Sequence, residues 1–442
     1  MSQHDFDVAN QAFAATRADI NAALQALASR NSGATAPAAT FAYMWWADTT
    51  TGILKQRNAA NSAWVNVLSL STGLPYATGT PSASTVLKGD GTWGTVATNG
   101  LFYKESTTSV AFTKTAANTA SIKAGTIVDV LGVSVTFAAA TAIVMPTLTA
   151  GTDYAIYACQ DGTVRADSSF TAPSGYTVAN SRLIGGFHYG LVASGTTVAG
   201  GSFNSAGSVQ TGGMVWTQPD VDKIAGINEY SLWDLKWRAN VSDLRAQKGF
   251  VLTDAGTWVA IYFAGTDTDT NGLSRNNVAV ASGTVLPKIP TTMGGNGTLT
   301  YADYTWWRAS EHARAYGARL LTDAEANIAF FGVTENQSLG GAASTIPLTT
   351  RQAGYTSKYG VEQATGHHWV WGDDSSGGTP AAYVANGGRG QSYANTVFKV
   401  ILGGSRADAA NSGSRASNWN SGPTNSSWSI GLRAACDHLM LV

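Results

Sequence analysis

The chain has 442 residues, of which 12% are charged, and its formal net charge is −1. Nucleic-acid binding depends on clustered lysine and arginine, so with this near-neutral charge we expect no nucleic-acid partner. The length is typical of two to four domains. The most apolar stretch, 126–146, is broken by Asp129 and Gly132 and alternates as strands do, so no membrane insertion is expected. Cys159 and Cys436 lie far apart in sequence and are expected to be buried thiols.

Apolar residues recur at every seventh position near the start of the chain, at Phe6, Phe13, Ile20 and Leu27. Good helix formers surround them, and Ser32-Gly33 predicts where the helix stops. A heptad pattern favours self-association of a short helix. An amphipathic helix that packs on its own domain has similar spacing, so both interpretations remain open.

Residues 34–71 are expected to form a small β region. Two tryptophans precede the turn 48–52, and apolar runs at 53–55 and 64–67 follow it, as in successive hairpins. A linker rich in Gly, Thr, Ser and Pro occupies 73–100. The segments MWWADTTTGILKQRNAANSAWVNV and VLKGDGTW resemble the attachment segments of bacteriophage tail fibres. This resemblance implies that residues 1–100 form an N-terminal helix and attachment region that binds other tail-fibre proteins.

Residues 101–215 are expected to form an intermediate β-sandwich domain. Short apolar runs alternate with turn signals at sandwich-like spacing. His188 is flanked by aromatic residues and is expected to be packed rather than catalytic. The glycine-containing stretch 207–226 is expected to be a loose domain boundary. The expected strands are 109–112, 127–130, 133–137, 154–157 and 163–165.

Residues 216–442 show a different pattern, with helices among the β signals. A helix is expected over 303–316, with Gly317 just past its end. Thr322 and Glu325 have the spacing of a capping box before a second helix. Together with the Trp-Val-Trp-Gly, Gly-Gly-Arg-Gly and terminal Gly-x-Arg motifs, this part resembles the C-type lectin fold, in the branch shared with formylglycine-generating enzymes. The expected fold class is therefore mainly β, with a C-terminal α+β lectin domain.

From about residue 101 to the end, the chain resembles the major tropism determinant family of Bordetella phages. The matching segments include SIKAGTIVDV, LTAGTDYAIYACQDGTVRADSSFTAPSGYT, GGFHY, INEYSLWDLK and the terminal SGSRA and CDHL. The first hundred residues do not resemble the start of that family. The resemblance implies a homotrimeric receptor-binding protein at the tail-fibre tip of the virion, with a host-cell surface receptor as its partner.

The last forty residues, 403–442, are expected to display a binding face on a rigid base. They lack helix or strand periodicity but are rich in Asn, Ser and Gly, which supply adaptable hydrogen bonds at recognition surfaces. The family resemblance implies that a diversity-generating retroelement varies selected positions here, with Arg406 and Trp428 left out. The implied variable, receptor-binding positions are Ser405, Ala407, Asp408, Ala409, Asn411, Asn418, Asn420, Ser421, Asn425, Ser427, Ser429 and Ile430. The expected scaffold residues are Trp369, Trp371, Arg415, Trp419, Arg433, Cys436 and Asp437.

Other functions are less well supported by the sequence than receptor binding. A lectin-fold enzyme is disfavoured because Cys436 has no nearby cysteine partner. A Cys-His pair with His438 is conceivable, but residues adjacent on a strand, such as Asp437 and His438, point to opposite faces. No cofactor is expected, although His367-His368 and Asp373-Asp374 leave room for a structural calcium or other cation. A protein receptor is favoured over a glycan because a Glu-Pro-Asn sugar motif is absent. A purely structural fibre subunit and a glycan-binding lectin without diversification remain the alternatives.

Overall fold

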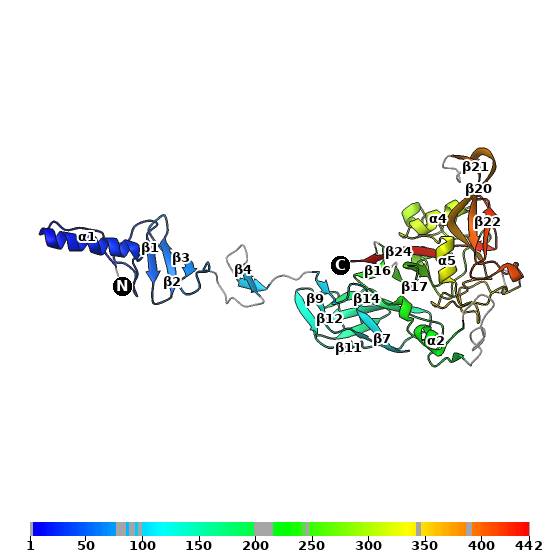
Figure 1. Ribbon diagram of the computed structural model, residues 1–442, viewed down its shortest axis with the longest axis horizontal. Helices are drawn as coiled ribbons and strands as arrows, with labels where there is room; N and C mark the ends of the chain where they lie inside the picture. Colours follow the sequence, from blue (N-terminus) through cyan, green and yellow to red (C-terminus); the bar gives the residue numbers. More distant parts are fainter. Residues whose placement is uncertain are drawn as a thin grey trace. The chain divides into compact units, whose positions relative to one another are not determined.

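The computed structural model describes residues 3–76, 85–87, 93–95, 100–198, 215–241, 243, 247–341, 346–385 and 391–441. The chain divides into two compact units, Met1–Ala97 and Thr98–Val442, which are described separately (Figure 1). No helix in the described ranges is long and apolar enough to cross a membrane.

The first unit contains one helix and small antiparallel sheets, as the sequence predicted. A three-stranded meander pairs its strands in chain order, and a short hairpin follows inside the expected linker. The predicted segment 88–92 of that hairpin lies outside the described residues. The elements are α1 (Phe13–Ala28), β1 (Trp45–Asp48), β2 (Ile53–Arg57), β3 (Trp64–Ser69), β4 (Thr85–Leu87) and β5 (Trp93–Thr95).

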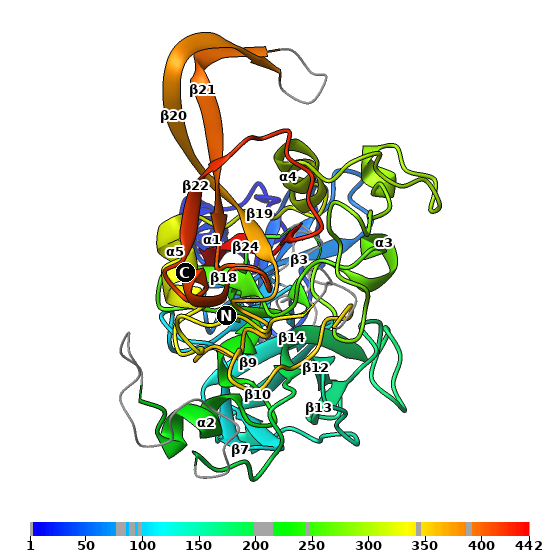
Figure 2. The same cartoon turned by 90° about the vertical axis from the view of Figure 1, so that its right-hand side faces the viewer.

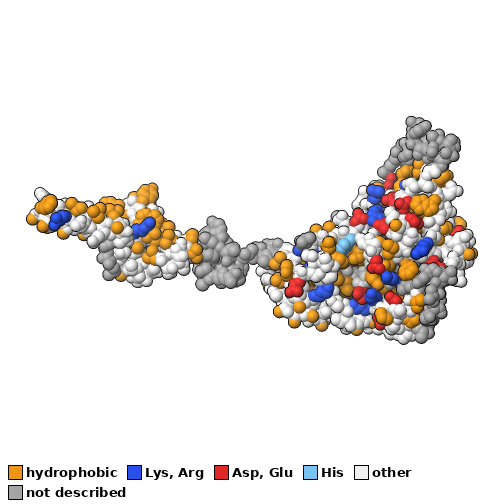
Figure 3. Space-filling model, in the orientation of Figure 1, with side chains coloured by type: hydrophobic (Ala, Val, Ile, Leu, Met, Phe, Trp, Pro, Cys, Tyr) orange, Lys and Arg blue, Asp and Glu red, His pale blue; other side chains and the backbone are white. Residues whose placement is uncertain are grey.

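The helix begins one heptad later than the sequence pattern predicted. Phe6 has a φ of 64° and lies outside α1, so its place in the heptad series was wrong. Within α1 only Ala26 is buried, whereas Phe13 is 82% exposed and Ile20, Leu24 and Leu27 are exposed as well. Figure 3 shows hydrophobic side chains on the surface of this helix. Its own unit therefore leaves the apolar stripe of α1 uncovered.

The second unit opens with two three-stranded antiparallel sheets around a common apolar core. The expected strand 109–112 begins only at Phe112. The Ala111 carbonyl accepts the Lys123 N–H at 2.8 Å, but the Ala111 N–H donates to the buried Asp234 carboxylate, 2.7 Å away. The sheets have the orders β10-β9-β6 and β11-β8-β7. Their strands are β6 (Phe102–Tyr103), β7 (Phe112–Ala116), β8 (Thr119–Ile122), β9 (Thr126–Val130), β10 (Val133–Phe137) and β11 (Thr141–Ala142).

A long antiparallel sheet connects the intermediate and C-terminal parts. Its order is β13-β12-β14-β15-β16-β24-β18-β17, with β19 also paired to β24. The terminal strand β24 thus pairs with strands that lie about two hundred residues earlier in the chain. The strands are β12 (Thr152–Cys159), β13 (Val164–Asp167), β14 (Ser181–Tyr189), β15 (Trp233–Asp234), β16 (Trp237–Ala239), β17 (Phe250–Leu252), β18 (Thr257–Ala260), β19 (Arg319–Leu320) and β24 (Ala434–Met440).

The expected loose boundary at 207–226 is partly wrong. Residues 207–214 lie outside the described residues, but α2 (Gln218–Ile224) is a helix. Thr217 and Asp220 form a capping box at its start, and Val221 and Ile224 are buried. Because the long sheet crosses this region and both parts belong to one compact unit, the domain division near residue 215 stays a prediction.

The C-terminal part adds helices and a second sheet with the order β22-β21-β20-β23. Both sequence-predicted helices are present: α4 lies within 303–316, Gly317 has a φ of +77°, and Thr322 with Glu325 forms the predicted capping box. The helical elements are η2 (Glu229–Ser231), α3 (Thr268–Asn271), η4 (Thr291–Met293), α4 (Trp306–Arg314), α5 (Asp323–Ala329) and η6 (Ala409–Asn411). The strands are β20 (Trp369–Ala385), β21 (Gln391–Leu402), β22 (Ser417–Ser421) and β23 (Ile430–Gly431).

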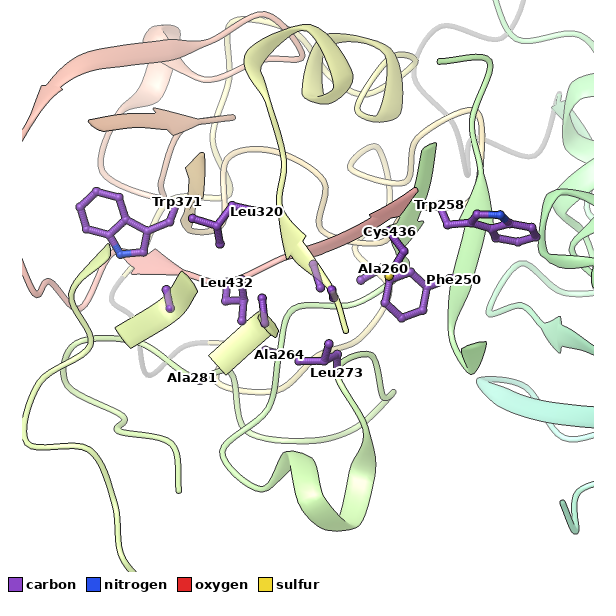
Figure 4. Packing of buried hydrophobic residues seen from close by; sticks show 14 of the residues in the cluster. Phe250, Trp258, Ala260, Ala264, Leu273, Ala281, Leu320, Trp371, Leu432 and Cys436 are labelled. Atoms are coloured by element: carbon purple, nitrogen blue, oxygen red, sulfur yellow. The ribbon is translucent and has the colours of Figure 1, made fainter. Parts of the chain in front are cut away.

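A large apolar cluster supports this part (Figure 4). Trp258 on β18, Trp371 on β20 and Cys436 on β24 pack in it with Leu320 and Leu432. Burying such aromatic side chains stabilises the fold because each removes a large apolar area from water. The segment that precedes β24 is thus attached to a packed base.

Candidate functional site

The expected binding face is built on the ends of the second sheet. The strands β20 and β21 extend together as a long hairpin from the rest of the C-terminal part (Figure 2). The loop 403–416 joins β21 to β22, and the loop 422–429 joins β22 to β23. The strand β23 is parallel to the start of β20, with Ile430 paired to Trp369.

The loop 403–416 is held by backbone groups, by residues outside the predicted variable set, and by the bonds from Ser405 to the Asp408 carboxylate. Gly403 and Gly404 have φ values of 89° and 87°, a conformation that favours glycine. The Gly403 N–H donates to the Ala416 carbonyl, 2.7 Å away, and closes the loop at its base. The Ser414 N–H and hydroxyl donate to the Glu335 carboxylate at 2.8 and 2.5 Å. Exposed side chains in this loop can therefore change without loss of these anchors.

The loop 422–429 is anchored in the same way. The Trp306 N–H donates to the Pro423 carbonyl at 3.1 Å. The Trp369 N–H donates to the Ser429 carbonyl at 2.7 Å, and the Gly283 N–H donates to the Ser427 carbonyl at 2.9 Å. A Cβ on Gly283 would lie 2.3 Å from the Ser427 nitrogen, so only glycine allows this close approach.

The predicted variable positions fall into three exposure classes. Half of them are exposed, and the Asn411, Asn420 and Asn425 side chains make no hydrogen bond to any other described residue. Three are half-buried: Asp408, Ser427 and Ser429. The exposed positions are Ala407, Ala409, Asn411, Asn418, Asn420 and Asn425.

Three predicted display positions are buried, which contradicts their expected exposure. Ser405 is 2% exposed. Its hydroxyl and N–H donate to the Asp408 carboxylate, and the Ser412 hydroxyl donates to its carbonyl. Ser421 is paired with Lys399 in the sheet, and Ile430 packs in the large apolar cluster. Tertiary contacts enclose these three side chains, although their sequence neighbourhood is polar.

Arg433 is the most completely enclosed of the predicted scaffold residues. It is 0% exposed, and its guanidinium donates to four carbonyls, those of Ala260, Ile261, Glu362 and Gln363, at 2.6–3.2 Å. Burial lowers its pKa to about 9, and the negative charge of Glu362 opposes that shift. The guanidinium of Arg433, the residue before β24, therefore joins the end of β18 to the segment before β20.

The other scaffold predictions have mixed outcomes. Trp369, Trp371 and Cys436 are buried, as expected. The Asp437 side chain is exposed, although it forms an ion pair with Arg319 at 2.7 Å. Trp419 is 40% exposed, so it is not a buried scaffold group, and Arg415 is exposed and has no side-chain bond to any other described residue that would fix the loop. The Trp419 indole donates to its near neighbour Ser417 at 3.0 Å, while its ring stays outside the core because β22 is the edge strand of its sheet.

A buried polar network beneath the loops was not predicted as a unit. Arg406 is 2% exposed and donates to the Ile346 carbonyl at 2.6 Å and to His367 Nε2 at 2.5 Å. Because His367 Nε2 accepts this bond, its Nδ1 carries the proton and donates to His368 Nδ1 at 2.7 Å. His368 in turn bonds to the Trp428 backbone. The network joins both loops, which agrees with leaving Arg406 and Trp428 out of the variable set.

The same network explains why these histidines stay neutral. Burial lowers the pKa of His367 well below its ordinary value, and the positive charge of Arg406 lowers it further. Burial and Arg406 lower the pKa of His368 to about 4. The sequence signal was the His-His pair, but its arginine partner lies 39 residues away and has no local signature.

The groups considered for catalysis are packed. His188 is 2% exposed and lies between Asp153, 2.9 Å from its Nδ1, and the Tyr262 hydroxyl, 3.1 Å from its Nε2. Both cysteines are buried and free, as expected. Burial raises the pKa of Cys436 to about 12, which disfavours the nucleophilic thiolate.

The residues considered for a cation have other partners. The two histidines contact each other, and the Asp374 carboxylate accepts the Asp323 N–H at the start of α5, 2.6 Å away. Within the described ranges, His, Cys, Asp and Glu form no group of three or more suited to a metal ion. The structural cation stays a prediction that these contacts do not support.

Comparisons with known proteins agree with the fold. The family model described as Mtd second domain matches residues 110–217. The tail fiber receptor-binding protein of Bordetella phage BPP-1 is 43% identical over 350 residues, which cover 77% of this chain and 85% of that protein. Solved structures of the U1 and P3c variants of the major tropism determinant each have a TM-score of 0.67, with 38% and 37% identity. Each comparison covers 91% of this chain and 96% of the other, and the expected mainly β fold with a C-type lectin part is confirmed.

Proposed function

This chain belongs to the major tropism determinant family of phage tail-fibre receptor-binding proteins, and we propose that it contacts its host receptor through the exposed side chains of 403–429. The protein is a virion-associated receptor-binding protein. Its place at the fibre tip is part of the proposal. We define the recognition face as Ala407, Ala409, Asn411, Asn418, Trp419, Asn420 and Asn425.

The observation that carries the proposal is the separation of anchoring from display. The loops are fixed by backbone bonds such as those at Pro423 and Ser429, and by the buried Arg406 network. The side chains of the recognition face take little part in these anchors. The Asn418 side chain is an exception, since it accepts the Asn420 N–H at 2.9 Å, but this bond joins residues only two positions apart. Such a face can vary without unfolding its base, which is what a diversified binding surface needs.

We propose further that this diversification arises from a retroelement that targets adenines in the coding segment. The four asparagines of the recognition face agree with this, since asparagine codons are rich in adenine. Ser405, Ser421 and Ile430, which the family resemblance placed in the variable set, are expected to tolerate fewer replacements because they are buried. A second copy of the coding segment beside a reverse transcriptase gene would support this part.

A protein receptor suits the recognition face better than a small sugar. The face comprises residues from two loops and from β22, so one partner must contact several separate segments. Trp419 supplies the largest exposed apolar side chain there, and tryptophan is enriched among the residues that dominate interface energies. Trp419 is therefore the expected central contact.

The test is attachment of the full chain to host cells. We expect Trp419→Ala to weaken binding by tenfold or more, equal to about 1.4 kcal/mol or more. Leu299→Ala removes another exposed apolar side chain outside the face and is the matched control. Treatment of the cells with protease should abolish binding, and removal of surface glycans should not. Equal binding by both variants and the wild type would reject the recognition face, leaving a structural fibre subunit as the better description.

We propose that the chain is a homotrimer and that α1 contributes to it. The stripe of Phe13, Ile20, Leu24 and Leu27 is exposed along one helix, and burial between copies would remove it from water. Ile20→Glu should lower the association state or its stability in sedimentation experiments, whereas Asn21→Glu, on the next position, should not. A trimer that is unaffected by Ile20→Glu would mean that the second unit alone holds the copies together.

A further inference from the structure

A hollow of about 320 Å³ on the C-terminal unit lies outside the recognition face. Four segments that are distant in sequence form it: the β17–β18 turn, the end of α5 with Phe331 just beyond it, the 358–359 segment, and the loop before β22. Its volume is in the range of small-ligand sites. The lining residues are Asp254, Asn327, Ile328, Phe331, Lys358, Tyr359 and Arg415.

Arg415 is the unusual member of this lining. It is exposed, and its guanidinium has no hydrogen bond or ion pair with any other described residue. Its backbone, in contrast, is fixed on both sides. Ser414 is bound to the Glu335 carboxylate, and the Ala416 carbonyl accepts the Gly403 N–H. A fixed backbone that presents an unused planar guanidinium is suited to a bidentate bond with a carboxylate or phosphate.

The remaining polar groups make the hollow net positive. Lys358 forms an ion pair with Asp254 at 3.1 Å, so the charges of that pair offset each other. The Lys358 ammonium also lies 5.2 Å from the centre of the Tyr359 ring. Arg415 is then left as the uncompensated charge, and the half-buried Asn327 adds an amide that can donate and accept.

The apolar part of the lining limits the ligand to more than a simple anion. Ile328 is exposed and the Phe331 ring is half-buried, and both line the hollow. They provide an apolar surface, which a bare inorganic ion does not need. A sugar ring has an apolar C–H face, hydroxyls for Asn327, and, when acidic, an anionic group for Arg415.

We propose that this hollow is a second binding site, for an acidic sugar whose carboxylate or phosphate is held by Arg415. The site is constant rather than variable, because it draws on α5 and the 358–359 segment as well as on the loop. It would allow the fibre to hold acidic surface glycans independently of the receptor. The proposal goes beyond the recognition face and does not depend on it.

The test is an NMR titration of the full chain with glucuronic acid, glucose 6-phosphate, glucose and inorganic phosphate, with no host receptor present. We expect saturable binding of at least one acidic sugar, at least tenfold tighter than that of glucose or of inorganic phosphate. Arg415→Gln should weaken this binding about tenfold, which is the scale of one charge-assisted contact. Lys236→Gln, which removes a cation from the β15–β16 turn, is the matched control and should bind as the wild type does. Melting curves show whether each variant is folded.

The two acidic sugars separate the sources of the anionic group, since preference for one identifies a uronic acid or a sugar phosphate. The proposal is overturned if neither acidic sugar saturates, if glucose or inorganic phosphate binds as tightly, or if Arg415→Gln binds as well as the wild type. Failure here leaves receptor attachment through Trp419 unaffected, so the two proposals are tested separately.

Discussion

Replacement of Arg433 by methionine should destabilise the second unit severely, although the methionine side chain fills most of the space that the arginine occupies. The four carbonyls would lose the guanidinium as a donor, although the Ile261 carbonyl keeps a backbone bond, from the Glu362 N–H at 2.9 Å. Each buried polar group left unsatisfied costs roughly 1–3 kcal/mol. Local relaxation recovers part of that loss, so we expect roughly 3–5 kcal/mol, the scale seen when one member of a buried polar set is removed. For a unit of this size, this corresponds to a fall in melting temperature of roughly 4–7 °C.

The assay is thermal and chemical denaturation of the full chain, with three comparison variants. Arg314→Met removes an exposed arginine from the last turn of α4 and should change stability by no more than about 0.5 kcal/mol. Asn420→Tyr and Asn425→His, on the recognition face, should also stay within about 0.5 kcal/mol. The reasoning fails if Arg433→Met melts with the wild type, or if the asparagine variants unfold as easily as Arg433→Met.

Four further outcomes are expected. Trp419→Ala should cost only about 1 kcal/mol in a melt, because its ring is 40% exposed, and a loss as large as a core tryptophan's would place it in the core instead. Thr322→Ala should cost about 1 kcal/mol in a urea titration because it removes the capping box of α5, whereas Thr322→Ser should cost little. Burial raises the pKa of Glu362 to about 7, so its contribution to stability is present below the unfolded pKa of 4.5 and is lost as pH rises through 7. Relative to Glu362→Gln, the wild type should therefore lose up to about 3 kcal/mol of stability between pH 4.5 and 8. Parallel curves of stability against pH for the two proteins would contradict this. Burial lowers the pKa of His368 to about 4, so its contribution is present above the unfolded pKa of 6.5 and is lost as pH falls through 4; His368→Gln should therefore show less acid destabilisation, by up to about 3 kcal/mol, in melts at pH 7 and 4.5.

Local elements were predictable because their causes lie within a few residues. The capping box of Thr322 and Glu325 forms between a side chain and backbone groups three positions apart, and it appears as the sequence indicated. The left-handed conformation of Gly317 after α4 is local in the same sense. Motif order over the last three quarters of the chain also carried the family, and with it receptor binding. Periodicity was less reliable at its ends: Phe6 matched the heptad but lies in a left-handed turn before α1.

Burial of individual side chains in 403–442 was decided by the tertiary structure. Arg415 and Arg433 each follow a glycine by two residues, yet one is exposed and the other is fully buried. The difference arises because the carbonyls that bind Arg433 come from β18 and from 362–363, which lie 70–173 residues away in sequence. Arg406 likewise depends on His367, which lies just before β20 and forms a parallel bridge with Ser405, the neighbour of Arg406. The sequence alone determines which residues can join such contacts, but the partners meet only when distant strands pair, so exposure and anchoring follow from the assembled sheets.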